Sequence, residues 1–103
     1  MNSKKWEWEM GAACEITEEV TVKSPLGLHG RPAAHIVKLA SSHHCHITLT
    51  NLESGESGDC GSILSLLVLA ASQGTRMLLH AVGEDATVAA QEISAYFSDG
   101  FNE

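Results

Sequence analysis

Polar and apolar residues alternate along two stretches of the chain, as they do in half-buried strands. Residues 18–23 follow this pattern, with Val20 and Val22 expected to face inward, and residues 46–50 alternate in the same way. Residues 77–82 are mostly apolar, which is typical of a well-buried strand. These patterns predict at least three strands.

Three other segments have the apolar spacing of helices. Apolar residues recur at helical spacing after Pro32, which predicts a helix to about Ser42. The segment after Ser62 is apolar almost all round, which predicts a short buried helix with Ser62 as its N-cap and Gly74 as its stop. Asp85 can cap a final helix. The apolar stripe of that helix consists of Ala86, Ala89, Ala90, Ile93 and Phe97.

The order of these elements indicates a fold class. Residues 51–61 are rich in glycine, serine and acidic residues and would ordinarily form a loop. The other segments mix strands with helices along the chain. This order indicates the α+β class, with helices packed on one face of an antiparallel sheet.

Composition and charge narrow the classes of function. A chain of 103 residues, 44% of them hydrophobic, is sufficient for one domain with a modest core. The formal net charge of −7 argues against nucleic acid as a partner, because nucleic-acid binding needs clustered Lys and Arg. No apolar run approaches the length of a membrane span, and no secretory leader is recognisable. Cys14, Cys45 and Cys60 have no framework spacing, so we expect reduced thiols and a cytoplasmic location.

The run His43-His44-Cys45-His46 contains residue types that bind metals. Adjacent residues cannot all turn toward one ion, and the sequence has no matching second pair of ligands. We therefore interpret this run as a solvated turn between a helix and a strand. We expect no metal site and no cofactor.

The loop before the first helix carries the strongest chemical signal. Pro25 and Gly27 favour a change of chain direction, and Pro32 suits the first turn of a helix. His29 should therefore lie at about the N-cap. A helix start presents unpaired N–H groups and a positive dipole end, which attract anions such as phosphate.

The residues at this helix start fit phosphoryl chemistry. Imidazole is a good nucleophile near neutral pH, and the Arg31 guanidinium forms a fork that matches phosphoryl oxygens. Gly30 allows the backbone to approach a ligand closely. The pattern predicts that His29 accepts a phosphoryl group reversibly. From the spacing alone, an N-capping turn whose histidine faces solvent is an equal alternative.

Residues 27–33, GLHGRPA, resemble the active-site signature of the HPr family, the phosphocarriers of the bacterial phosphoenolpyruvate-dependent sugar phosphotransferase system. Residues 62–67, followed by Gly74, the strand-like residues 77–81 and residues 83–86, resemble the segment of that family that contains its regulatory serine. The resemblance extends from about Glu18 to Phe97.

The resemblance implies a particular version of the α+β fold. It is the open-faced β-sandwich with the order β-α-β-β-α-β-α, in which three helices cover one face of a four-stranded antiparallel sheet. A third strand of about two residues is then expected within residues 51–61, although this stretch lacks inward apolar residues. We expect the domain over residues 18–103 and an N-terminal extension over residues 1–17. The extension fits a short strand or an unstructured tail, and Met10 is an alternative start.

The resemblance also implies a function. His29 would accept a phosphoryl group through Nδ1 from phospho-Enzyme I and pass it to sugar-specific Enzyme II A-type proteins. Arg31 would neutralise the transferring oxygens, Gly30 and Pro32 would complete the phosphate-stabilising loop, and Lys38 would contribute to the partner surface. Such a protein is a covalent relay, not a stand-alone enzyme, and we expect it to be a monomer.

Ser62 has two interpretations that can both hold. Serine is among the best N-capping residues. By resemblance, a dedicated kinase phosphorylates this serine in some family members, which weakens coupling to Enzyme I. The alternative function is therefore a regulatory protein that signals through phosphorylation of His29 or Ser62 without sugar transport.

Overall fold

The computed structural model describes residues 14–103, and residues 1–13 of the predicted extension lie outside them. Four strands form one sheet in the spatial order β1-β4-β2-β3, and every pairing is antiparallel. Their bounds are β1 Glu15–Thr21, β2 Cys45–Asn51, β3 Ser57–Asp59 and β4 Arg76–Gly83.

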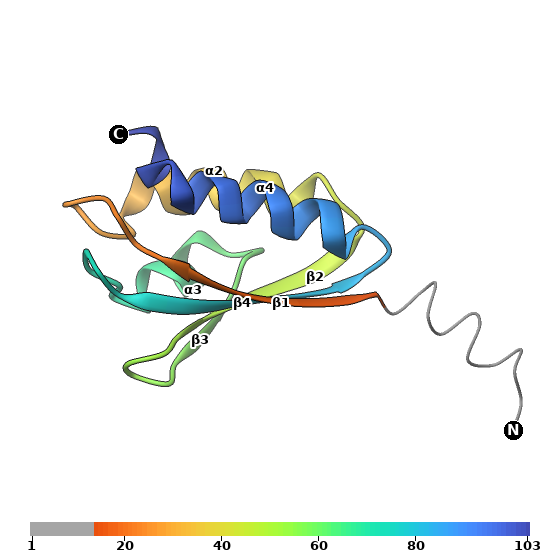
Figure 1. Cartoon of the computed structure of the whole chain (residues 1–103), viewed down its shortest axis with the longest axis horizontal. Coiled ribbons are helices and arrows are strands. Elements are labelled where there is room, and N and C mark those ends of the chain that lie inside the picture. The colour runs from red at the N-terminus through yellow and green to blue at the C-terminus, as the bar shows by residue number, and fades with distance from the viewer. Residues whose placement is uncertain (1–13) are drawn as a thin grey trace, which may run out of the picture.

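The helices lie on one face of this sheet. Figure 1 shows α2 and α4 over the same face of the sheet, whose opposite face is left open, and the two helices contact each other. The short α3 contacts α2 and β3. The bounds are α2 Gly30–Ser41, α3 Ile63–Leu67 and α4 Ala86–Ser98, followed by the 3-10 turn η1 Gly100–Asn102. The arrangement confirms the predicted open-faced α+β sandwich.

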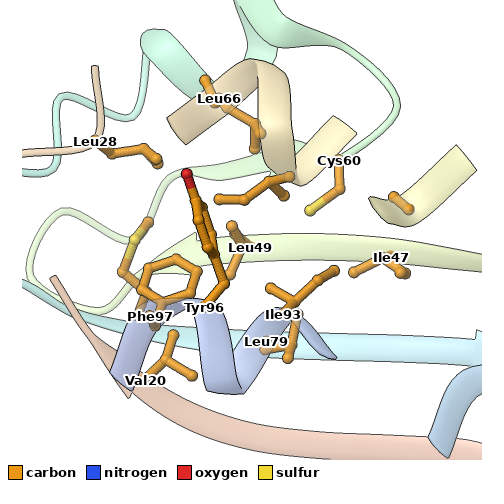
Figure 2. Close-up of a cluster of buried hydrophobic side chains, with 14 of the residues drawn as sticks. Val20, Leu28, Ile47, Leu49, Cys60, Leu66, Leu79, Ile93, Tyr96 and Phe97 are labelled. Atoms are coloured by element: carbon orange, nitrogen blue, oxygen red, sulfur yellow. The ribbon is translucent and has the colours of Figure 1, made fainter. Parts of the chain in front are cut away.

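The core lies between the helices and the sheet. Val20 and Val22 are buried as predicted, and Met77, Leu79 and Ala81 are the buried positions of β4. Figure 2 shows aromatic and aliphatic side chains of α4 packed toward those of the strands, including Ile93, Phe97, Leu49 and Leu79. Burial of each large apolar side chain contributes about 1.5–3 kcal/mol, so this interface accounts for much of the fold's stability.

The third strand, which the resemblance implied, forms over three residues. Its inward position is Gly58, and a Cβ placed there would lie 2.5 Å from the carbonyl oxygen of Ser65. The backbone of α3 therefore packs directly on β3. This close approach explains why the stretch has no inward apolar residue.

The first strand begins at Glu15 and ends at Thr21, so the predicted bounds of residues 18–23 were wrong. Glu15 pairs with Val82, at the far end of β4. The alternation was hidden because Glu18 occupies a half-buried position between Ile16 and Val20. A charged residue at this position interrupts the apolar pattern that predicts a strand.

The second helix differs from its prediction. Ser62 caps it as expected, because Ser62 Oγ accepts a hydrogen bond from Ser65 N at 3.2 Å. However, α3 ends at Leu67, and Gly74 lies in the turn before β4 with φ +91°. The helix is also not buried, because Leu66 is its one buried residue. Its apolar side chains instead form an exposed surface.

Asp85 occupies the N-cap position of α4, but the predicted side-chain cap was wrong. The Asp85 side chain makes no capping hydrogen bond to its own helix. Its carboxylate accepts a hydrogen bond from His44 N at 2.8 Å. It thus joins the turn between α2 and β2 to the start of α4.

Candidate functional site

The loop before α2 is held in place by the segment that follows α3. Leu28 is buried, and its N–H donates to the carbonyl oxygen of Ala71 at 2.9 Å. Gly27 has φ +73°, and a Cβ there would lie 2.6 Å from the same oxygen. Both the conformation and the close approach therefore require glycine. This anchoring fixes the position of the next residue, His29.

His29 is the N-cap residue of α2 and has extended backbone angles, φ −97° and ψ −169°. Its side chain does not cap the helix, and the first turn contains no acidic residue. Pro32 is buried in that turn, where a missing backbone donor breaks no helical hydrogen bond. The imidazole thus stands at a helix start whose donors no side chain of the helix satisfies. This environment suits an anion.

A carboxylate contacts the imidazole of His29. His29 Nε2 lies 2.7 Å from Glu103 Oε2, and the two side chains are 32% and 18% exposed. The hydroxyl of Ser24, which is buried, donates a hydrogen bond to Glu103 Oε1. This hydrogen bond is the main cause that lowers the pKa of Glu103, and His29 and Arg31 add to the effect. Glu103 is therefore an ionised acceptor at neutral pH.

The segment that carries Glu103 is fixed by an aromatic cluster. Phe101 is buried, and its ring centroid lies 5.1 Å from that of Tyr96 and 5.0 Å from that of Phe97. Lys23 Nζ also donates to the carbonyl oxygen of Ser98 at 3.2 Å. Sequence analysis missed Glu103. The sequence feature that could have indicated an ordered segment here is Phe101, an apolar residue one helical turn beyond Phe97.

His29 and Arg31 line one hollow, as predicted, together with Pro25, Leu26 and Glu103. Arg31 is exposed and forms no ion pair within residues 14–103. A Cβ at Gly30 would meet no other atom within 4 Å. Glycine at this position is therefore not required by a neighbouring group, and its predicted role concerns an approaching ligand.

An exposed apolar surface is formed by α3. Leu64 is 70% exposed on α3, which also packs against α2, and the C-cap residue Val68 is 59% exposed. We call this group the α3 apolar surface, and it comprises Ile63, Leu64, Leu67 and Val68. Leu26, which is 71% exposed, adds an apolar side chain from the histidine loop. Surfaces of this kind typically mark interaction sites.

The other predicted residues lie away from the hollow. Ser62 caps α3, as described above. Lys38 is exposed in the last turn of α2, so it lies about 13 Å along the helix axis from His29. The helix thus places His29 and Lys38 at opposite ends.

The histidine run does not converge on one point. His43 Nε2 lies 2.9 Å from Glu92 Oε1 on α4, whereas His46 faces Asp59 on β3. Within residues 14–103, no group of three or more His, Cys, Asp or Glu residues is arranged to hold a metal ion. No helix among these residues has the length and hydrophobicity to cross a membrane.

Comparison with known proteins identifies the family. The family model described as "PTS HPr component phosphorylation site" matches residues 16–99. The chain is 38% identical over 88 residues to phosphocarrier protein HPr of Xylella fastidiosa, covering 85% of this chain and 97% of the relative. The chain therefore belongs to the HPr family of the phosphotransferase system.

Solved structures agree with this assignment. The crystal structure of HPr-C-His from Thermoanaerobacter tengcongensis matches with a TM-score of 0.79 and 28% identity, over 85% of this chain and 97% of that one. The solution structure of Crh, the catabolite repression HPr of Bacillus subtilis, matches with a TM-score of 0.59 and 34% identity, over 80% and 95% of the two chains.

Proposed function

We propose that this protein is a phosphocarrier that accepts a phosphoryl group on His29 from phospho-Enzyme I and passes it to a sugar-specific Enzyme II A-type protein. The observation that carries the proposal is the position of His29. It stands at the open start of α2, within the region matched by the family model, and shares a hollow with Arg31. A nucleophile, a fixed cation and a helix dipole thus face the same space.

In the transfer step, Nδ1 of His29 attacks phosphorus. The exposed Arg31 has no competing ion pair among the described residues, so its guanidinium is free to neutralise the phosphoryl oxygens in the transition state. The start of α2 contributes a further ~0.3–1 kcal/mol of charge stabilisation at an exposed site. This small value suits a relay, because a carrier that bound the group too tightly would not release it. The protein ends each cycle unchanged and converts no small molecule itself.

Partner proteins would dock on the α3 apolar surface and Leu26. These side chains are exposed, and the hydrogen bond from Leu28 N to the carbonyl oxygen of Ala71 joins the loop that carries His29 to the segment after α3. Lys38, at the other end of α2, would lie at the rim of the contact. A phosphoryl donor must bring its phosphorus to the hollow, so a docking surface close to His29 is a mechanical requirement of transfer.

The direct test is the intact mass of the purified protein after incubation with phosphoenolpyruvate and Enzyme I. We expect the wild type to gain one phosphoryl group that mild acid removes, and we expect His29→Ala to gain none. His43→Ala is the matched control, because His43 lies just beyond the opposite end of α2 and its substitution should leave the gain unchanged. No gain by the wild type with a competent Enzyme I would refute the proposal.

A regulatory protein is the second candidate. The chain resembles Crh, whose name refers to catabolite repression, and Ser62 is a half-buried N-cap residue at the start of α3. A phosphate at a helix N-terminus is electrostatically favourable, so phosphorylation by a serine kinase would change surface charge without unfolding α3. A protein that signalled through Ser62 alone would not need His29 as a nucleophile. Binding to a partner that depended on Ser62 phosphorylation and not on His29 would favour this candidate.

We further propose that the protein acts as a monomer in the cytoplasm. Cys14, Cys45 and Cys60 are all unpaired thiols, which agrees with a reducing compartment. Size-exclusion chromatography with light scattering tests the monomer directly.

A further inference from the structure

The contact between His29 and Glu103 restricts the protonation of the imidazole. An ionised carboxylate can only accept hydrogen bonds, so the 2.7 Å contact between Glu103 Oε2 and His29 Nε2 requires a proton on Nε2. A neutral imidazole carries one proton. Its lone pair must then be on Nδ1.

We propose that Glu103 is a positioning residue, which fixes His29 in the tautomer that leaves Nδ1 unprotonated and nucleophilic. This inference deepens the proposed function and rests on it, because it assigns a reason for transfer at Nδ1. A carboxylate that orients a histidine through its second nitrogen is a general device in catalytic and metal sites. Here Glu103 does not touch the phosphoryl group and acts through the ring.

The transfer step balances with this assignment. The Nδ1 lone pair forms the N–P bond, and the bond between phosphorus and the donor's leaving atom breaks, with its electron pair remaining on the donor. The ring keeps its Nε2 proton and becomes a phosphoimidazolium with one positive charge. Glu103 lies against that proton, so its negative charge stabilises the charge that develops on the ring.

The carboxylate is held independently of the histidine. Ser24 is 2% exposed and binds the other oxygen of Glu103, while Phe101 fixes the preceding backbone in the core. Two anchors thus fix the carboxylate before a phosphoryl donor arrives. This preorganisation distinguishes Glu103 from a surface residue that meets an imidazole by chance.

The test is the tautomer of His29, measured from ¹⁵N chemical shifts of the full-length protein above the pH range in which imidazole ordinarily titrates. We expect a protonated Nε2 and an unprotonated Nδ1 in the wild type. Glu103→Gln should give a mixture of tautomers, because an amide can donate as well as accept. Glu103→Asp, which keeps the charge, should restore part of the preference. Glu92→Gln is the matched control, since it removes the carboxylate that contacts His43.

Phosphorylation by phosphoramidate, a small donor that needs no docking surface, gives the second readout. We expect Glu103→Gln to react about three- to tenfold more slowly than the wild type, the loss expected for one hydrogen bond of ordinary net strength at a partly exposed site. Glu92→Gln should react at the wild-type rate. A protonated Nδ1 in the wild type, or equal tautomers and rates for wild type and Glu103→Gln, would overturn the inference. Since the tautomer is measured without a donor, its failure is distinguishable from failure of the proposed phosphocarrier function.

Discussion

The ring of Phe101 meets the ring of Phe97 edge-on, with centroids 5.0 Å apart and planes inclined by 68°. This contact fastens the segment after α4 to the core, and the same segment carries Glu103 to His29. The packing of an aromatic pair and the geometry of the candidate site are therefore linked. Phe101 also adopts φ 59°, a conformation rarely taken by residues other than glycine, so packing must hold it there.

Replacing Phe101 with Ala should therefore affect both stability and the site. We expect a loss of about 3 kcal/mol of unfolding free energy in urea titrations, the low end for a buried Phe→Ala change. The Nε2–H preference of His29 should be lost with it. Phe101→Leu, which keeps most of the apolar contact, is the control. An unchanged His29 tautomer in a destabilised Phe101→Ala protein would separate the two effects and contradict the link.

The N-cap residue of α3, Ser62, gives a second prediction, which concerns stability. Ser62→Ala removes the hydrogen bond from Ser65 N and should lower the unfolding free energy by about 1 kcal/mol. Ser62→Asp keeps a capping oxygen and adds a negative charge at a helix start, so its stability should equal or exceed that of the wild type. Chemical denaturation measures both. Equal losses in the two variants would show that capping is not the role of this side chain.

Close packing of β3 on α3 makes Gly58 sensitive to substitution. In Gly58→Ala, the new Cβ would lie 2.5 Å from the carbonyl oxygen of Ser65, and backbone must move to relieve the overlap. We expect a loss of about 1–3 kcal/mol in thermal or urea unfolding. The control is Gly30→Ala, where the Cβ enters open space and the stability should not fall. A Gly58→Ala protein as stable as wild type would mean that the two backbones are further apart.

The buried thiol of Cys60 predicts a pH dependence. Burial raises the pKa of Cys60 from 9.0 to about 12, with smaller contributions from Asp59 and Cys45. The folded state thus keeps a proton that the unfolded state releases. This stabilisation is complete below pH 9 and is lost as the pH rises toward 12, so the unfolding free energy should fall over that interval. Cys60→Val should make the unfolding free energy less dependent on pH over this interval. If the slope against pH is unchanged by the substitution, other groups cause the pH dependence.

The α3 apolar surface should matter for partner-dependent transfer and not for intrinsic reactivity. We expect Leu64→Gln to lower kcat/KM for phosphorylation by Enzyme I about fivefold, the effect of losing roughly 1 kcal/mol at an interface. Phosphorylation by phosphoramidate should be unaffected. Val88→Gln changes an exposed apolar residue on α4 and serves as the control. If Leu64→Gln matches the wild type with Enzyme I, docking occurs elsewhere.

Local sequence patterns correctly predicted those elements in which buried and exposed positions follow a regular order. Val20 and Val22 alternate with polar residues because both are buried in the core, Val20 within β1 and Val22 just past its end. The position of His29 followed from the proline and glycine residues around it. The bounds of β1 failed where Glu18 stands at an inward position. The burial of α3 failed because an all-apolar sequence does not distinguish a helix inside the core from one that exposes its surface.

The contact between His29 and Glu103 could not be predicted from local sequence patterns. Glu103 lies 74 residues from His29 along the chain, and the contact exists because α4 and Phe101 return the chain to the histidine loop. Such a contact depends on tertiary packing alone. Similarly, Gly58 resembles a loop residue in the sequence. Its strand forms by pairing with β2, and the position is glycine because α3 leaves no room for a side chain.

The most direct measurement is NMR of the phosphorylated protein, with ³¹P and ¹⁵N-labelled histidine, after reaction with phosphoenolpyruvate and Enzyme I. The account predicts a single phosphoryl group bonded to Nδ1 of His29, with Nε2 protonated. A phosphoryl group on Nε2, on another histidine or on a serine would contradict it.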